Sequence, residues 1–389
     1  MNKKTIRDID LAGKKVLLRV DFNVKTQDGT VVEDARVRAA LPTIKYILEQ
    51  QAALIIISHL GRPHGVFDKV FSLRPVAQLL GKLLGLPVRF APDCLGAPAE
   101  EQAAVLGFGQ VLMLENLRFH KEEEQNDLAF ARQLAGLADV FVNDAFGMAH
   151  RAHASTEGVA KLLPAYAGLL MESELNSLSK IALAQERPLV AVIGGAKVAD
   201  KIGMIENLLT KVDKLLLGGG MANTFLAAQG YNMQGSAVEV DRLPWVKELL
   251  IKENAHKLVL PADVVAAAAF TAQADHRCVL PDAMPQGWLA LDIGSITRQI
   301  FAAELSRARS IVWNGPLGVF ELPPFAAGTV EIAQAIANSG AFSVIGGGDS
   351  IAAVNQAQVA QHISFISTGG GAMLKFLEGK TLPGVDVIL

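Results

Sequence analysis

Short, almost purely apolar runs alternate along the chain with longer amphipathic segments. The runs with strand character are "KKVLLRVDFNV" (14–24), "ALIIISHLGRP" (53–63), "QVLMLENLRFH" (110–120), "DVFVNDAFGMAHRAHAS" (139–155), "LVAVIGG" (189–195), "KLLLGGG" (214–220), "SIVWNGP" (310–316), "FSVIGGG" (342–348) and "SFISTGGG" (364–371). Segments such as 36–51 have apolar residues at helical spacing instead. Continuous apolar strands that alternate with helices predict parallel sheets covered by helices on both faces.

Two such series divide the chain. The segment 169–188 between them predicts one helix, with Glu172 and Glu174 near its start and Pro188 just beyond its end. We therefore predict an α/β fold of two doubly wound, Rossmann-like domains joined by a hinge helix. The predicted boundaries are 1–170 for the N-terminal domain, 171–188 for the hinge helix and 189–375 for the C-terminal domain.

The composition narrows the class of protein. The chain of 389 residues is 51% hydrophobic and 19% charged, so it can bury a large core, and its net charge of −3 argues against a general nucleic-acid binder. Cys94 and Cys278 form no CxxC pattern, which argues against a disulfide scaffold or a zinc site. The sequence contains no signal-peptide core and no apolar run long enough for a membrane helix, so we expect a soluble cytosolic protein.

Charged and hydrogen-bonding groups follow the strands of the first half, where ligands of parallel sheets bind. They are Asp21, Asn23, His59, Arg62, Arg118, His150, Arg151 and His153, and Arg36 begins the helix after the first strand. Any one arginine could equally be a solvated surface residue, but four at equivalent positions favour a small ligand with several negative charges. His150 and His153 have a spacing that metal ligands can have, but no third ligand is near and Arg151 would repel a cation.

Glycine dominates the corresponding positions of the second half. The clusters are "GGAKVADK" (194–201), "GGGMANTF" (218–225), "WNGPLGVFE" (313–321) and "GGGDSIAA" (346–353). Glycine permits close backbone approach, and helices that begin just after it direct free N–H groups at an anion. One glycine pair would only indicate a tight turn, whereas four clusters with Lys197, Lys201 and Asp349 predict a nucleotide phosphate site.

Neither of two common nucleotide-binding fingerprints is present. "GKT" at 379–381 lacks the required earlier glycine, since Leu374 stands there, and Gly379 is more simply a helix C-cap. "GGGMAN" and "GGGDSI" lack the last glycine of G-x-G-x-x-G, which argues against a nicotinamide dehydrogenase on paired α/β domains. A two-lobed anion-binding solute receptor is the second alternative; such proteins carry an export signal and have no use for a glycine-rich nucleotide site.

The chain resembles the phosphoglycerate kinase family in nine motifs. They occur in the order found in that family and span nearly the whole chain. They are "RVDFNV", "SHLGRP", "LENLRF", "NDAFGMAHRAHAS", "GGAKVADK", "GGGMANTF", "WNGPLGVFE", "GGGDS" and "STGGGA". The departures are small: Met148 stands where small or hydroxyl residues are common, and Ser350 replaces a threonine. The resemblance implies phosphoryl transfer from 1,3-bisphosphoglycerate to ADP, giving 3-phosphoglycerate and ATP. It also implies a monomer, and a C-terminal return segment, 376–389, that packs on the N-terminal domain.

The resemblance also implies a role for each matching residue. Phosphoglycerate would be bound by Asp21, Asn23, Arg36, His59, Arg62, Arg118 and Arg151. The nucleotide would be bound by Gly195, Ala196, Lys197, Lys201, Gly219, Gly220, Asn314, Pro316, Gly318, Glu321, Gly347, Gly348, Asp349 and Ser350, and Asp349 would hold Mg²⁺. Arg36 and Lys201 are the expected cationic stabilisers, and Gly370 and Gly371 would cradle the phosphoryl group in transit. Because the acceptor oxygens are ionised near neutral pH, the reaction needs no general base, and none is evident among the motifs.

Overall fold

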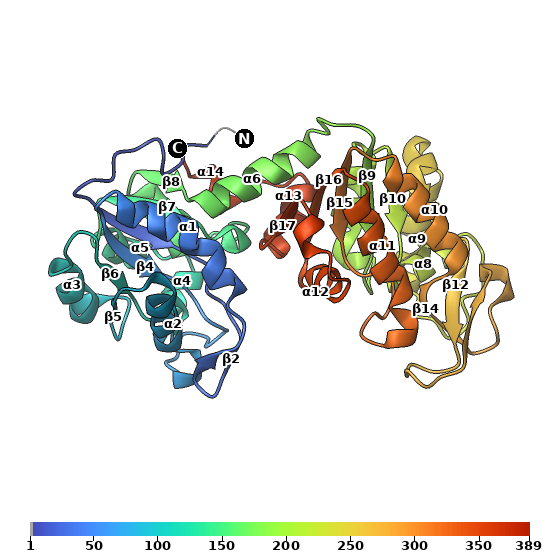
Figure 1. Ribbon diagram of the computed structural model, residues 1–389, viewed down its shortest axis with the longest axis horizontal. Helices are drawn as coiled ribbons and strands as arrows, with labels where there is room; N and C mark the ends of the chain where they lie inside the picture. The colour runs from blue at the N-terminus through green and yellow to red at the C-terminus, as the bar shows by residue number, and fades with distance from the viewer. Residues whose placement is uncertain (1–2) are drawn as a thin grey trace. The chain divides into compact units, whose positions relative to one another are not determined.

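The computed structural model describes residues 3–389, which form two compact units (Figure 1). The first unit contains residues up to Asn176 together with Thr381–Leu389, and the second contains Ser177–Lys380. In this part of the chain no helix is both long and apolar enough to cross a membrane.

The first unit is built on a six-stranded parallel sheet. Its strands, in spatial order, are β5 (Val88–Phe90), β6 (Val111–Met113), β4 (Ala53–Ile57), β1 (Lys15–Arg19), β7 (Val140–Asn143) and β8 (Ala165–Ala167). Its helices are α1 (Ala35–Glu49), α2 (Arg74–Leu84), α3 (Gly96–Ala104), α4 (Lys121–Glu124), α5 (Leu128–Ala135) and α14 (Pro383–Asp386). A small hairpin, β2 (Thr26–Gln27) with β3 (Thr30–Val31), precedes α1.

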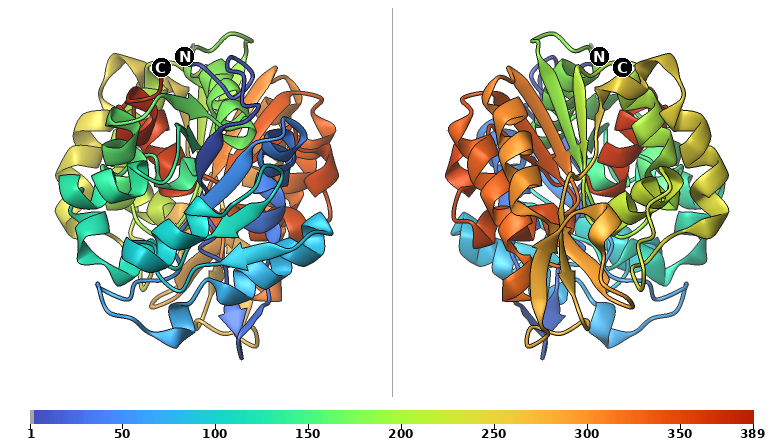
Figure 2. Two further views of the ribbon diagram at one scale, coloured as in Figure 1. Left: turned by 90° about the vertical axis from the view of Figure 1, so that its left-hand side faces the viewer. Right: turned by 90° about the vertical axis from the view of Figure 1, so that its right-hand side faces the viewer.

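Strand residues of the first unit point alternately into two hydrophobic cores. Val16 and Leu18 of β1 pack in one core with α1 and α2, whereas Leu17 packs in the other with α3 and α5. The left view of Figure 2 shows helices on both sides of this sheet. Burial of both faces explains why β1 and β4 read as continuous apolar runs with no alternation.

The second unit has a six-stranded parallel sheet and a three-stranded antiparallel one. The parallel strands, in spatial order, are β11 (Leu258–Val259), β10 (Lys214–Leu217), β9 (Leu189–Ile193), β15 (Ser310–Asn314), β16 (Phe342–Gly346) and β17 (Phe365–Ser367). The antiparallel strands are β13 (His276–Val279), β12 (Val264–Ala267) and β14 (Leu289–Ile293). The helices are α7 (Ile202–Leu209), α8 (Gly220–Ala228), α9 (Leu243–Leu250), α10 (Ser295–Ser306), α11 (Ala327–Asn338), α12 (Gly348–Gln356) and α13 (Gly371–Leu377).

The parallel sheet of the second unit has the strand order 3-2-1-4-5-6 when its own strands are counted along the chain. This is the order of dinucleotide-binding folds, in which ligands bind where the order reverses, here between β9 and β15. Helices α10, α11 and α12 cover one face around the buried Trp313, and yellow-green helices lie on the other side in the right view of Figure 2. The prediction of two parallel sheets covered by helices is thus confirmed, whereas the antiparallel sheet was not predicted.

Helix α6 (Leu169–Ala182) links the two units and ends before the predicted limit of 188. Ala184 adopts the left-handed conformation with φ 46°, its N–H donates to Ile181 O, and the N–H of Gln185 donates to Lys180 O. These two bonds form a Schellman motif, which ends a helix usually at glycine. The predicted end was wrong because an alanine at this position gives no sequence signal.

Gly379 ends α13 as predicted. It has φ 75°, its N–H donates to Phe376 O, and the N–H of Lys380 donates to Lys375 O. This is again a Schellman motif, so the "GKT" sequence is confirmed as a helix end. The chain then joins the first unit, where Gly384 N donates to Ala149 O at 2.9 Å.

Candidate active site

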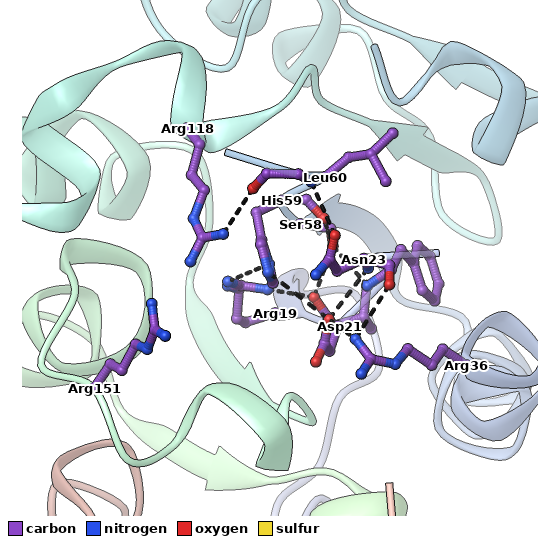
Figure 3. Close-up of polar contacts among 12 residues, drawn as sticks. Arg19, Asp21, Asn23, Arg36, Ser58, His59, Leu60, Arg118 and Arg151 are labelled. Atoms are coloured by element: carbon purple, nitrogen blue, oxygen red, sulfur yellow. Dashed lines mark hydrogen bonds and ion pairs between the residues drawn. The ribbon is translucent and has the colours of Figure 1, made fainter. Parts of the chain in front are cut away.

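Arg19, at the end of β1, is the centre of a polar cluster in the first unit. Its side chain is fully buried, its Nε donates to Ser155 Oγ at 2.8 Å, and its Nη2 lies 3.2 Å from His59 Nδ1 (Figure 3). Ser155 Oγ in turn donates to Oε1 of the buried Glu123 at 2.6 Å. A buried arginine requires such partners, because an unpaired buried charge costs several kcal/mol.

Arg19 was not among the predicted site residues, although the sequence contains a signal for it. It directly continues the buried apolar run of β1, in a strand that is buried on both faces. Glu123 gives no such signal, because "KEEE" reads as a solvated helix start. Burial alone would raise the pKa of Glu123, but His153, Arg19 and Ser155 outweigh burial and lower it. Glu123 is therefore ionised and balances the charge of Arg19.

His59, after β4, is held as a neutral imidazole. Burial, and then the charges of Arg19, Arg118 and Arg36, lower its pKa well below the usual value. Because Arg19 can only donate, His59 Nδ1 must accept, which places the ring proton on Nε2. Nε2 lies 3.9 Å from Asp21 Oδ1, so this N–H faces the cluster and can donate a hydrogen bond to a ligand oxygen.

Asp21 and Asn23, in the loop after β1, orient the neighbouring arginine. Arg36 Nη1 donates to Asp21 Oδ1 at 3.0 Å and to Asn23 O at 3.2 Å. The Asn23 side chain accepts from Gly61 N at 2.9 Å, so it also fixes the loop after β4. Arg36 remains about one-third exposed and can still bind a ligand.

Arg118 and Arg151 approach the cluster from two other strand ends (Figure 3). Arg118 follows β6; it is nearly buried, its Nη1 donates to Gly61 O at 2.8 Å, and its Nε lies 3.2 Å from Glu124 Oε1. Arg151 follows β7, and its Nε donates to His150 Nε2 at 3.3 Å. Arg62 is exposed on the loop after β4. Arg19, Arg36 and Arg118 thus lie near enough to His59 to lower its pKa, and Arg151 faces the same cluster (Figure 3), with Arg19 in addition to the predicted set.

In the second unit, a cavity of about 310 Å³ lies at the carboxyl ends of β9, β15 and β16. It is lined by Gly195, Ala196, Lys197, Asp200, Lys201, Asn314, Gly315, Pro316, Gly347, Gly348, Asp349 and Ser350. Ten of these residues are in the predicted nucleotide set, whereas Asp200 and Gly315 are not. Of that set, Gly219, Gly220, Gly318 and Glu321 are not part of the lining.

Lys201 is the buried cation of this cavity. Its Nζ donates to Asn314 O at 3.1 Å and to Asn314 Oδ1. Burial lowers the pKa of Lys201 to about 8, against the opposing effect of Asp349 and Asp200. Asn314 Nδ2 donates to Gly346 O at 2.7 Å, and Ser350 Oγ accepts from Gly315 N at 2.6 Å, so the loops after β15 and β16 hold each other.

The glycines outside the cavity allow the loops to pack closely. Gly219 N donates to Leu317 O at 2.9 Å, and a Cβ on Gly219 would lie 2.8 Å from backbone atoms of Gly195 and Pro316. A Cβ on Gly318 would lie 2.2 Å from the buried Asp292 carboxylate. Glu321 is exposed in the loop after β15. In this structure these glycines shape the loops that carry Lys201 and Asn314.

Comparison with known proteins assigns the chain to a family. The model of one protein family, described as phosphoglycerate kinase, matches residues 6–380. The chain belongs to the phosphoglycerate kinase family. It is 56% identical to the phosphoglycerate kinase of Moorella thermoacetica over 387 residues, which cover 99% of this chain and 98% of the relative. It is 54% identical to that of Pelotomaculum thermopropionicum over 391 residues and the full length of both chains.

Solved structures of phosphoglycerate kinases have the same fold. The enzyme from Coxiella burnetii matches with a TM-score of 0.91 and 43% identity, covering 99% of this chain and 98% of that one. The enzyme from Pyrococcus horikoshii matches with a TM-score of 0.87 and 35% identity over the same shares. The resemblance inferred from the nine motifs is therefore confirmed at the level of family and fold.

Proposed function

We propose that this enzyme transfers a phosphoryl group reversibly between 1,3-bisphosphoglycerate and ADP, giving 3-phosphoglycerate and ATP. Membership of the phosphoglycerate kinase family supports the reaction. The observation that carries the assignment to these residues is the contrast between the two polar sites. One gathers arginines around a neutral histidine, and the other holds a single buried lysine over glycine turns.

The arginine cluster of the first unit binds the phosphoglycerate in this proposal. Arg36, Arg62, Arg118 and Arg151 offer planar donor forks to the carboxylate and phosphate oxygens. His59 donates a hydrogen bond from its Nε2–H to a neutral oxygen of the substrate, while Asp21 and Asn23 orient Arg36. A neutral His59 adds hydrogen bonding without a further charge that the arginines would repel.

The cavity of the second unit binds the nucleotide. Its position at the reversal of strand order, and the backbone N–H groups at the start of α12, suit a chain of phosphates. We assign the remaining predicted contacts, Gly219, Gly220, Gly318 and Glu321, to the adjoining loops. Lys197 is exposed and Lys201 buried on this cavity, so the two lysines can contact phosphates at different depths.

Asp349 suits the magnesium ion that accompanies nucleotides. Its carboxylate is exposed in the first turn of α12, on the wall of the cavity and close enough to Lys201 to oppose the lowering of the lysine pKa by burial. Mg²⁺ prefers one or two carboxylates together with phosphate oxygens and water, and this arrangement leaves those positions available. When bound, the ion neutralises charge on the phosphates.

Transfer in this proposal is a direct in-line displacement without a general base. The bond between phosphorus and the acyl oxygen of C1 breaks as the bond between phosphorus and a β-phosphate oxygen of ADP forms. Both the entering and the leaving oxygen are ionised near neutral pH, so no proton must move. Arg36 and Lys201 stabilise the negative charge on the moving group, and Gly370 and Gly371 offer their N–H groups to it.

The two substrates are bound by different units, so transfer requires movement about the link through α6. Closure would exclude water and so limit hydrolysis of the acyl phosphate. We assign the domains as 1–170 and 189–375, joined by a hinge at 171–188 of which α6 forms only the part up to Ala182. Of the proposed return segment, 376–389, the residues Thr381–Leu389 belong to the first unit. We also propose that the enzyme acts as a cytoplasmic monomer and binds neither nucleic acid nor membranes.

A coupled assay tests the reaction directly. ATP formation is measured with 1,3-bisphosphoglycerate and ADP, with Mg²⁺ present and then with a chelator. We expect ATP to form only when both substrates and Mg²⁺ are supplied. Reduction of a nicotinamide cofactor in place of ATP formation would favour a dehydrogenase, and anion binding without turnover would favour a solute-binding protein.

A further inference from the structure

A cysteine, a histidine and an aspartate meet in the first unit at a place that the kinase reaction does not use. Asp93 and Cys94 follow β5, and His120 follows β6, which is the neighbour of β5 in the parallel sheet. One ligand atom from each of the three residues lies within 4.8 Å of the other two. Among the described residues, 3–389, this is the one group of at least three such ligands.

From this geometry we propose that Asp93, Cys94 and His120 form a binding site for Zn²⁺. Sulfur and imidazole ligands select borderline-soft ions of this kind, whereas Mg²⁺ prefers oxygen ligands. The proposal differs from the expectation, based on the spacing of the cysteines alone, that neither cysteine serves a zinc site. The three ligands come from two segments that are brought together by the pairing of β5 with β6.

The site needs little rearrangement to admit an ion. Asp93 Oδ1 now lies 2.7 Å from His120 Nε2 and accepts from Cys94 N at 2.6 Å. Bonds of about 2.0–2.3 Å to a tetrahedral zinc ion place ligand atoms about 3.3–3.8 Å apart. The contact between Asp93 and His120 must therefore open by about 0.6–0.8 Å, and a water molecule would complete four ligands.

The surroundings of the site favour an ion that stays bound. Cys94 is fully buried in the core beside α3, and the ring of Phe130 lies 5.7 Å from that of His120. The carboxylate of Asp93 within the group attracts a cation. On binding, the S–H bond breaks, sulfur bonds to zinc, and the proton passes to solvent.

Cobalt titration tests the proposal, because Co²⁺ bound to a thiolate has a charge-transfer absorption that Co²⁺ on oxygen ligands lacks. Reduced protein, free of nucleotide and Mg²⁺, is titrated with Co²⁺. The chain has only Cys94 and Cys278, and Cys278 is exposed in β13. Cys278→Ala is therefore the matched control and is expected to keep the absorption, with one equivalent bound, whereas Cys94→Ala is expected to lose it.

A second pair of variants tests the other ligands even where Cys94→Ala fails to fold. Zn²⁺ affinity is measured by displacement of Co²⁺ from Asp93→Asn and His120→Gln, whose side chains are partly exposed. Each change is expected to weaken Zn²⁺ binding by more than about tenfold. Loss of a residue that only contacts a metal ligand already weakens binding by about tenfold or more, and loss of the ligand itself should cost more than that. The exposed His362→Gln serves as the control with unchanged affinity. Absence of the absorption in Cys278→Ala, or unaltered affinity in both ligand variants, would overturn the proposal.

Discussion

The buried charge of Lys201 lowers the free energy of unfolding, so a variant without this charge should be more stable. Its side chain is 9% exposed, and burial lowers its pKa from 10.5 to about 8. One unit of pKa corresponds to about 1.4 kcal/mol, so burying the charged form destabilises the fold at pH 7 by about 3 kcal/mol. Lys201→Met removes the charge and keeps the length of the side chain. It also leaves Asn314 Oδ1 without the donor that Lys201 supplies, at a cost of about 1–2 kcal/mol, whereas Asn314 O still accepts from Gly194 N.

We therefore expect Lys201→Met to raise the free energy of unfolding by about 1–2 kcal/mol at pH 7. The same change should lower kcat by about 10²–10³-fold, because the cation at the moving phosphoryl group is lost. Denaturant unfolding, followed by fluorescence and circular dichroism, measures the first effect, and the coupled ATP assay measures the second. If the variant is inactive and more stable, the charge of Lys201 serves the reaction and does not stabilise the fold.

The pH dependence of the free energy of unfolding tests whether the buried charge of Lys201 causes this difference in stability. Since the folded-state pKa is lowered, the unfolded chain binds more protons between about pH 8 and pH 10.5, and the stability of the wild type rises with pH in that window. The advantage of Lys201→Met should therefore shrink as the pH rises from 7 to 10. The reasoning is refuted if the variant is less stable at pH 7, or if its advantage is independent of pH.

Three further changes test the proposed roles. Arg36→Ala should lower kcat by at least about 10²-fold with little effect on folding, because Arg36 is partly exposed; unchanged turnover would remove its assigned role. Arg118→Ala should raise the KM for 3-phosphoglycerate and leave ADP affinity near normal in calorimetric titration; an equal loss for ADP would contradict the assignment of the two sites. Gly370→Val should reduce turnover more than ADP affinity. A Cβ at Gly370 would meet open space, but the φ of 46° is strained for valine, so the backbone N–H groups of this loop are displaced. The reverse result would place this loop in the resting nucleotide site.

The inner strands of both parallel sheets could be predicted because burial on two faces leaves a plain signal, whereas the edge strands β5, β8 and β11 were not predicted. β4 has five buried apolar residues in succession, and β9 has the same pattern. The two outer strands of the antiparallel sheet, β13 and β14, give no comparable signal. β13, with the sequence "HRCV", is largely exposed, and β14 contains Asp292, whose carboxylate accepts from the backbone N–H of Gly328. Neither strand could be separated from a loop by its own sequence.

Some residues of the candidate site could likewise be predicted from the sequence, and others could not. Residues that follow strands, such as His59 and Lys201, could be found from topology, because the carboxyl ends of parallel strands meet at one edge. Glu123 could not, since its burial depends on Arg19 and Ser155, which are far away in sequence. The protonation state of His59 also depends on the distant Arg19 and on burial, so only a structure could establish it.

The first unit is assembled from both ends of the described chain, since Thr381–Leu389 belong to it. Leu389 N donates to Ala165 O at 3.2 Å, and Lys4 N donates to Leu389 O at 2.7 Å. During synthesis the whole second unit, Ser177–Lys380, is therefore made before the first unit can acquire its last segment. The first unit begins to fold earliest and becomes complete last, so a nascent chain that stops before residue 381 exposes the surface that this segment would cover.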